Sequence, residues 1–323
     1  MSHPLDRAGV VELAILERSG LDESRHLGAA VVVSPDGSVL RELGDGSALV
    51  YGRSSLKLFQ AIAVLRSGVS LEGAQLVLAT ASHAGTPAHV AVVRSVLDRA
   101  GLDENALQCP IDWPLDSASR HAAAAPSRVT MNCSGKHAAF LLACVHNGWP
   151  TDTYLERDHP LQQLIRSTVE EFIGEPIGRI GVDGCGAPVF ATTLRGLATG
   201  VANACSSTDG EAARLVRAIL GDPWAIDGPG RANTVVAEQL GLVTKGGAEG
   251  VIIMAAPGRA AVALKMVDGS NRATTLVALR LLASVGVISE DDAARVAGLT
   301  TERVLGGGVP VGTIRASELV TQG

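Results

Sequence analysis

The residues best suited to chemistry in the first part of the chain lie in the segment 53–57, which contains Ser54 and Lys57. An apolar run over 58–65 follows and ends at Gly68, a pattern that predicts a buried helix. Because a helix turns about 100° per residue, Ser54 and Lys57 share one helix face. A lysine whose pKa is lowered by burial can take the proton from a serine hydroxyl and make it a nucleophile. Taken by itself, the spacing favours the simpler interpretation of a capping serine beside a solvated lysine.

Further polar groups stand in later segments, beside glycines or at the start of apolar helices. Cys133 opens an apolar helix and Cys185 lies in the glycine-rich turn 181–188, and both settings favour a thiolate. Two small buried cysteines are the plain alternative. Ser82 and Lys245, taken singly, fit an ordinary loop serine and a solvated lysine beside glycines.

The pattern of apolar residues predicts strands near both ends of the chain and helices between them. Strand-like runs occupy 10–16, 26–33, 38–43, 251–256 and 260–267. Residues 102–130 are irregular, and the helical patterns on either side of them include 58–65, 87–100, 159–173, 190–203, 210–220, 231–240, 271–285 and 289–297. The short run 75–80 fits either a strand or a helical turn. We expect the tail from 306 to 323 to be loosely ordered. We therefore expect an α+β fold in a single domain over 1–323, with a sheet from about 10–50 and 245–270 covered by helices.

Composition restricts the possible partners. The chain has 323 residues, of which 46% are hydrophobic and 19% charged, so it can form a sizeable core. A net charge of −6 argues against nucleic acid or an anionic membrane as a partner. No apolar run reaches the roughly 18 residues that a membrane span requires. Residues 1–7 lack the pattern of a secretory signal, and five cysteines suit a reducing compartment, so we expect a cytoplasmic protein.

Five segments occur in an order that resembles one known family: Arg53–Lys57, Ala81–His83, Asn132–His137, Asp183–Cys185 and Leu242–Lys245. The set is similar to the asparaginase II family, also called class 3 and typified by the rhizobial thermolabile enzyme. The resemblance spans about residues 10–310. The segment Asn132–His137 is its most specific part, and the ordered set is far more specific than any single motif.

This resemblance implies a fold like that of serine β-lactamases and serine glutaminases, usually as a homodimer. It implies hydrolysis of L-asparagine to L-aspartate and ammonia. Two serine–lysine pairs match the catalytic positions of the family, namely Ser54 with Lys57 and Ser82 with Lys245. We expect Ser54 to be the nucleophile and Lys57 its base, while Ser82 and Lys245 assist proton transfer through an acyl-enzyme.

The resemblance also implies a zinc ion beside the substrate, held at positions that match Cys133, Lys136 and Cys185. Further pocket positions match Arg53, His137 and Asp183, with Arg53 suited to a carboxylate and Asp183 to an ammonium group. Asn233 departs from the family, because the typical member has a cysteine near the substrate at this position.

Two other functions compete with an asparaginase. The first is a glutaminase or another β-lactamase-like serine amidohydrolase, although Lys245-Gly246-Gly247 only loosely matches the Lys-Thr-Gly strand of β-lactamases. The second is a non-enzymatic zinc-binding protein that uses Cys133, Lys136 and Cys185. It would bind metal without releasing ammonia and would leave both serine–lysine pairs unexplained.

Overall fold

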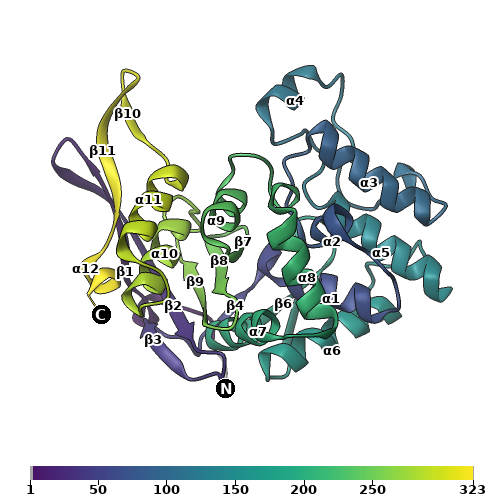
Figure 1. Cartoon of the computed structure of the whole chain (residues 1–323), viewed down its shortest axis with the longest axis horizontal. Coiled ribbons are helices and arrows are strands. Elements are labelled where there is room, and N and C mark those ends of the chain that lie inside the picture. The colour runs from purple at the N-terminus through teal and green to yellow at the C-terminus, as the bar shows by residue number, and fades with distance from the viewer. Residues whose placement is uncertain (1–2, 323) are drawn as a thin grey trace.

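The computed structural model describes residues 3–322, and its main element is an antiparallel sheet built from both ends of the chain (Figure 1). The strands run in the order β10-β11-β1-β2-β9-β8-β7, and β3 pairs with β2. They are β1 (Val11–Arg18), β2 (Leu21–Val33), β3 (Val39–Leu43), β7 (Val243–Gly246), β8 (Val251–Ala256), β9 (Ala260–Met266), β10 (Val304–Gly306) and β11 (Val309–Ala316). The predicted α+β class, with an antiparallel sheet drawn from both chain ends, is confirmed.

This sheet separates two apolar cores, because successive strand residues point to opposite faces. In β2, Val31 and Val33 belong to the larger core, whereas Ala30 and Val32 belong to the smaller one. Helix α7 (Leu194–Ser206) packs on the first face, and helix α10 (Thr274–Ser284) packs on the second. Strands that are buried on both faces carry apolar residues without a break, which explains the apolar runs seen in the sequence.

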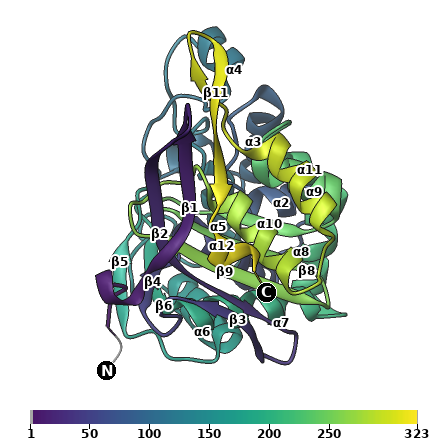
Figure 2. The ribbon, with the colours of Figure 1, turned by 90° about the vertical axis from the view of Figure 1, so that its left-hand side faces the viewer.

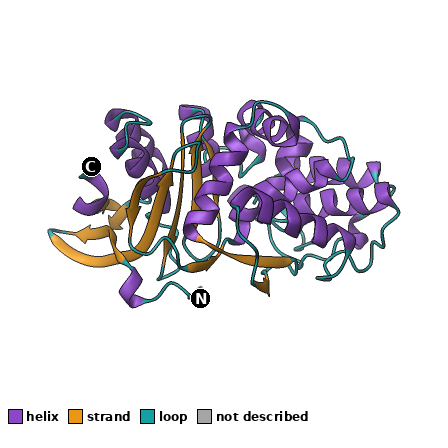
Figure 3. Ribbon diagram, turned by 90° about the horizontal axis from the view of Figure 1, so that it is seen from below, coloured by secondary structure: helices purple, strands orange, loops and turns teal. Residues whose placement is uncertain are grey.

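A body of helices lies beside the sheet, so that strands gather at one end of the molecule and most helices at the other (Figure 3). Its helices are α1 (Lys57–Arg66), α2 (Gly73–Thr80), α3 (Pro87–Arg99), α4 (Ser117–Ala122), α5 (Ser134–Asn147), α6 (Pro160–Ile173) and α8 (Gly210–Gly221). Helices α9 (Ala232–Leu240), α11 (Glu290–Thr300) and α12 (Glu318–Thr321) join α10 on the second face of the sheet. No helix in the described part of the chain has the length and apolarity needed to cross a membrane.

Short elements connect the sheet to the helices. The 3₁₀ turns are η1 (Arg7–Gly9), η2 (Arg53–Leu56), η3 (Glu104–Ala106) and η4 (Pro223–Ala225). A second sheet has the order β4-β6-β5 and consists of β4 (Leu49–Tyr51), β5 (Arg179–Val182) and β6 (Pro188–Thr193). It connects the turn that carries Ser54 to the loop that carries Asp183, because β4 precedes η2 and β5 precedes that loop.

The structure corrects two of the sequence-based expectations and decides one that was open. The described part of the tail is ordered, because β11 pairs with β1 from Ala14↔Ala316 to Arg18↔Gly312. Figure 2 shows β1, β2 and β11 side by side, although β11 comes from the opposite end of the chain. The ambiguous run 75–80 is helical and forms most of α2, and the segment 190–193 is strand before α7 begins. The sheet therefore extends beyond the predicted limit of 270.

Candidate active site

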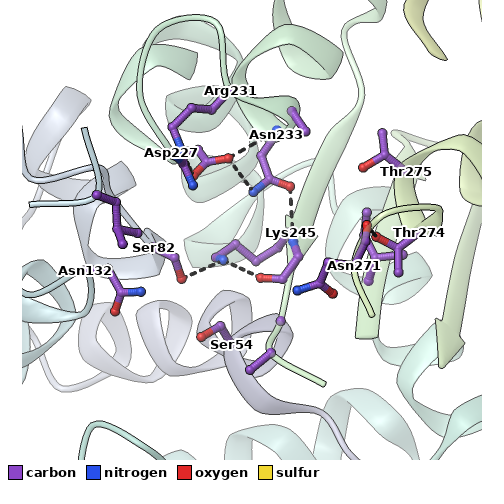
Figure 4. Close-up of a pocket in the computed structure, with 16 residues that line it drawn as sticks. Ser54, Ser82, Asn132, Asp227, Arg231, Asn233, Lys245, Asn271, Thr274 and Thr275 are labelled. Atoms are coloured by element: carbon purple, nitrogen blue, oxygen red, sulfur yellow. Dashed lines mark hydrogen bonds and ion pairs between the residues drawn. The ribbon is translucent and has the colours of Figure 1, made fainter. Parts of the chain in front are cut away.

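The candidate active site is a cavity of about 360 Å³ between the helical body and the edge strand β7 (Figure 4). Its wall contains both predicted serines, Ser54 and Ser82, together with Lys245 and Asn233. The other polar residues of the wall are Asn132, Asp227, Arg231, Asn271, Thr274 and Thr275. The structure therefore joins polar groups from six separate stretches of the sequence around one space large enough for an amino acid.

Both catalytic lysines of the prediction converge on the hydroxyl of Ser82. Lys57 Nζ lies 3.0 Å from Ser82 Oγ, and Lys245 Nζ lies 2.8 Å from the same oxygen. Each lysine also donates to a backbone carbonyl, Lys57 to Ala81 O at 2.5 Å and Lys245 to Gly246 O at 2.7 Å. A hydroxyl that lies between two amines can pass a proton from one to the other.

Strand geometry determines where Lys245 points. It lies two residues after Val243 on β7, so its side chain shares the strand face of Val243, which packs in the larger core toward the helical body. Lys245 is only 2% exposed. Burial, followed by repulsion from Lys57, lowers the pKa of Lys245 to about 7. A substantial fraction of Lys245 is therefore neutral, and able to accept a proton, near neutral pH.

The predicted direct pairing of Ser54 with Lys57 differs from the geometry observed. Ser54 lies in the 3₁₀ turn η2, and Lys57 is the first residue of α1. Among residues 3–322, no hydrogen bond joins these two side chains. Lys57 is 1% exposed, and a buried amine needs hydrogen-bond partners, which Ala81 O and Ser82 Oγ supply. The Ser54 hydroxyl instead faces the cavity.

The backbone around Ser54 is unusual. Arg53 has φ +50°, a left-handed conformation that is uncommon for a residue other than glycine. Gly247 packs closely against this turn, since a Cβ placed on Gly247 would lie 3.3 Å from Ser54 N and 3.2 Å from Gly52 O. Within the described residues, the N–H groups of Ser54 and Ala248 take part in no hydrogen bond, and both residues line the cavity. Two such donors suit an oxygen that gains negative charge.

The predicted substrate-binding residues Arg53, Asp183 and His137 lie outside the lining of this cavity. Arg53 Nε donates to Asp183 Oδ1 at 2.7 Å, so these two charges neutralise each other. His137 is fully buried, and its Nδ1 lies 2.7 Å from the hydroxyl of Tyr154. Burial lowers the pKa of His137 to about 4, so this ring is neutral.

The predicted metal ligands form a buried cluster next to the serine–lysine site. Lys136 Nζ lies 3.0 Å from Cys185 Sγ, and Lys57 Nζ lies 3.1 Å from Cys133 Sγ. The interaction with Cys133, then the charge of Lys136, outweighs burial and lowers the pKa of Cys185, which favours its thiolate form. Burial opposes the charge on Lys136, but attraction to Cys185 and Cys133 outweighs it and raises the pKa of Lys136.

The donor atoms of this cluster fit a zinc ion. Thiolates and a neutral nitrogen are ligands that zinc prefers, and Cys133, Lys136 and Cys185 bring two sulfurs and one amine together. His137 Nε2 is buried and has no hydrogen-bond partner in the described structure. Cys185 raises the pKa of His137, against the larger effect of burial. No group of three His, Cys, Asp or Glu side chains within residues 3–322 is placed to hold a metal, so a site here depends on the lysine amine.

Asp227 and Arg231 were not predicted from the sequence, yet both line the cavity beside Asn233. Arg231 Nε donates to Asp227 Oδ1 at 2.8 Å, and Asn233 Nδ2 donates to Asp227 Oδ2 at 3.1 Å. The one signal in the sequence was the turn 228–230, Gly-Pro-Gly, which marks a place where backbone approaches other groups closely. Asn132 belongs to the motif Asn132–His137, but the sequence did not predict that it lines the cavity.

Two buried lysines on one serine hydroxyl, beside a cavity, form an arrangement that can exchange protons with a small molecule. The chain belongs to the L-asparaginase II family, whose model matches residues 14–316. No curated protein matches the chain significantly.

Solved structures that are similar to this chain include two of Mglu and one of a Bacillus glutaminase. Mglu in its native form is 14% identical, with 82% of this chain and 66% of that chain covered and a TM-score of 0.46. Mglu in its glutamate form is 14% identical, covers 82% and 62%, and has a TM-score of 0.47. A Bacillus glutaminase is 13% identical, covers 74% and 83%, and has a TM-score of 0.41. The chain thus spans about two thirds of the Mglu chains that it matches.

Proposed function

We propose that this protein is an amidohydrolase of the class 3 asparaginase type, which converts L-asparagine and water to L-aspartate and ammonia. The observation that carries the proposal is the Ser82 hydroxyl held between Lys57 and Lys245 at the wall of a cavity that also contains Ser54. Membership of the L-asparaginase II family supports the reaction class.

Amide hydrolysis needs a base first and an acid afterwards. In the proposed reaction, Ser54 Oγ attacks the side-chain carbonyl carbon of asparagine, and its proton passes by way of Ser82 to a neutral lysine. The C–N bond then breaks as the lysinium returns that proton to the leaving nitrogen, which departs as ammonia. Water attacks the resulting serine ester by the same route, and aspartate leaves with Ser54 restored. Lys245 suits the role of base because its pKa is lowered to about 7 by burial and by Lys57.

The carbonyl oxygen of the substrate gains negative charge during each attack. The unbonded N–H groups of Ser54 and Ala248 are the donors available to it at the cavity wall. The left-handed conformation of Arg53 and the close approach of Gly247 hold the backbone of this turn in place.

Recognition of the amino acid backbone of the substrate is assigned to Arg53 and Asp183, with His137 and Asn233 as further pocket residues. A zwitterionic substrate can exchange with the Arg53–Asp183 ion pair, because its carboxylate replaces Asp183 on Arg53 and its ammonium replaces Arg53 on Asp183. The exchange leaves no charge unpaired.

Zinc is part of the proposal, with Cys133, Lys136 and Cys185 as the residues that would hold it. When bound, it would orient the substrate and tune its affinity. Lys136 must lose its proton to become a ligand, so metal uptake at this cluster would release a proton. Metal analysis of protein purified without added zinc tests this part of the proposal, and a fully active metal-free enzyme would contradict it.

The decisive experiment measures ammonia release from L-asparagine and L-glutamine side by side, with and without a chelator. Release from asparagine is expected, and a preference for glutamine would instead favour a glutaminase. Ser54→Ala and Ser82→Ala should each lower kcat by at least about 10²-fold. A diazoketone analogue of asparagine should label Ser54, as read by peptide mass spectrometry. Metal binding without ammonia release from either amide would replace the proposal with a zinc-binding protein.

A further inference from the structure

Asp227 is a buried carboxylate in the cavity wall that the chemistry above does not use. It is 6% exposed, and both of its oxygens accept hydrogen bonds. Oδ1 accepts from Arg231 Nε at 2.8 Å, and Oδ2 accepts from Asn233 Nδ2 at 3.1 Å and from Asn233 N at 3.4 Å. The bond to Asn233 N lies at the start of α9, where no other side chain caps the helix. Asp227 therefore fixes both the helix end and the side chain of Asn233.

The amide of Asn233 continues this connection to the strand that carries Lys245. Asn233 Oδ1 accepts from Gly246 N at 3.1 Å, and Gly246 O accepts from Lys245 Nζ at 2.7 Å (Figure 4). One unbroken series of hydrogen bonds thus runs from Asp227 through Asn233 and Gly246 to Lys245, and ends on Ser82. The edge strand β7 is only four residues long, so this side-chain tether is an important constraint on its end.

We propose that Asp227 and Asn233 are positioning residues that hold Lys245 against Ser82, an inference that rests on the proposed function of that site. Asparagine suits position 233 because its amide accepts from Gly246 N and donates to a carboxylate at the same time. A cysteine, which the family resemblance implies at this position, is a weak donor and a weak acceptor and cannot replace both bonds.

The charges around Lys245 come from several elements. Lys57 reaches it from α1, Cys133 from the start of α5, and Arg231 and Asp227 from the loop before α9. Lys57 and Arg231 favour the neutral amine, whereas Asp227 and Cys133 favour the ammonium form. Loss of the Asp227 charge should thus ease proton loss from Lys245, in addition to loosening its attachment.

The test compares three variants of the full chain: Asp227→Asn, Asn233→Ala and the control Asp292→Asn. Asp292 lies in an exposed ion pair with Arg295 on α11, so its substitution changes the net charge equally but leaves the cavity intact.

Labelling of Lys245 by acetic anhydride is followed against pH by peptide mass spectrometry, and kcat and KM are measured for asparagine. Asp227→Asn should move the labelling midpoint of Lys245 to lower pH, and Asp292→Asn should not. Asn233→Ala should lower kcat by about tenfold or more with KM little changed, because a misplaced proton-transfer group slows the chemical step.

Either of two results overturns the proposal. The first is a folded Asp227→Asn protein with the wild-type labelling midpoint, and the second is an Asn233→Ala protein in which KM alone changes, as expected if Asn233 only contacts substrate. If Asp227→Asn does not fold, the kcat and KM of Asn233→Ala decide the question. The labelling needs no turnover, so a wild-type protein that releases no ammonia refutes the proposed function while the midpoint still tests the positioning network.

Discussion

Two buried lysines of this protein, Lys245 and Lys136, are hidden from solvent to the same degree but differ in what surrounds them. They are 2% and 1% exposed. Lys245 contacts a hydroxyl and a carbonyl and lies near the positive charge of Lys57, and its pKa is lowered to about 7 by burial and by that charge. Lys136 contacts the thiolate of Cys185. Burial lowers the pKa of Lys136, but attraction to Cys185 and Cys133 outweighs burial and raises this pKa.

The difference shows that burial alone does not assign a role to a lysine, because the neighbouring charges decide its protonation state. Lys245 exchanges a proton near neutral pH, as a general base must. Lys136 keeps its proton against a thiolate, and a metal ion has to displace that proton. In the proposed function, the two regions would have different tasks, namely proton transfer at Ser82 and metal binding at the thiol cluster.

The largest expected effect comes from removing each amine while keeping the shape of its side chain. Lys245→Met should lower kcat by about 10³-fold, because the base is lost. It should also raise the free energy of unfolding at pH 7 by about 1–2 kcal/mol, since a buried group that resists charging is replaced by an apolar one. Lys136→Met should instead lower the free energy of unfolding by about 2–3 kcal/mol, because the substitution leaves the Cys185 thiolate unpaired.

Urea unfolding of metal-free protein measures both stabilities, and ammonia release measures activity. Lys265→Met is the matched control, because Lys265 lies on β9, is bonded to Glu249 O and makes no contact with Ser82. Its turnover should stay at the wild-type level. Equal changes in stability for Lys245→Met and Lys136→Met would break the comparison between the two lysines.

A second prediction uses pH. If neutral Lys245 is the base, kcat/KM should rise as pH increases through about 7, where this lysine loses its proton. The same group makes stability depend on pH, because the unfolded chain holds the proton up to about pH 10 while the folded chain releases it earlier. Its contribution to stability is therefore complete at high pH and is lost as pH falls toward about 7.

Pre-steady-state or steady-state rates from pH 5.5 to 9 at roughly constant ionic strength test the first part, and urea midpoints over the same range test the second. The slope of stability against pH above 7 should become smaller in Lys245→Met. A kcat/KM that is flat across this range would remove Lys245 from the role of base, whatever its place in the structure.

Local patterns in the sequence were enough to predict the elements that surround the site. The predicted hairpin over 26–43 and the strands of 251–267 are confirmed. Strands β2, β8 and β9 carry apolar runs because both of their faces are buried. Strand β11 was missed because only one of its 8 residues is buried and its partner β1 lies about 300 residues away in sequence. Pairing at that distance leaves no local pattern.

The site itself could be predicted only in part, for a physical reason. The ordered motifs identified Ser54, Ser82 and Lys245, all of which line the cavity. The side-chain direction of Lys57 depends on acceptors at residues 81 and 82, so the spacing of Ser54 and Lys57 did not show that the amine lies on Ser82. Asp227 follows no motif, and its role depends on partners that only folding brings to it.

The smallest expected effect tests how tightly the backbone of the cavity is packed compared with the rest of the molecule. Gly247→Ala places a Cβ 3.2 Å from Arg53 Cβ and 3.3 Å from Ser54 N, so the turn that carries Ser54 must move by a few tenths of an ångström. Since this displaces a reacting group, kcat should fall by about tenfold while stability changes by less than about 1 kcal/mol. Gly298→Ala on α11 is the control, because an added Cβ there meets nothing within 4 Å. That variant should keep full turnover and gain about 0.5–1 kcal/mol from better helix propensity. Equal turnover in the two variants would show that the close approach of Gly247 to Ser54 does not matter for catalysis. Proton transfer at Ser82 would then tolerate a displacement of the turn that carries Ser54.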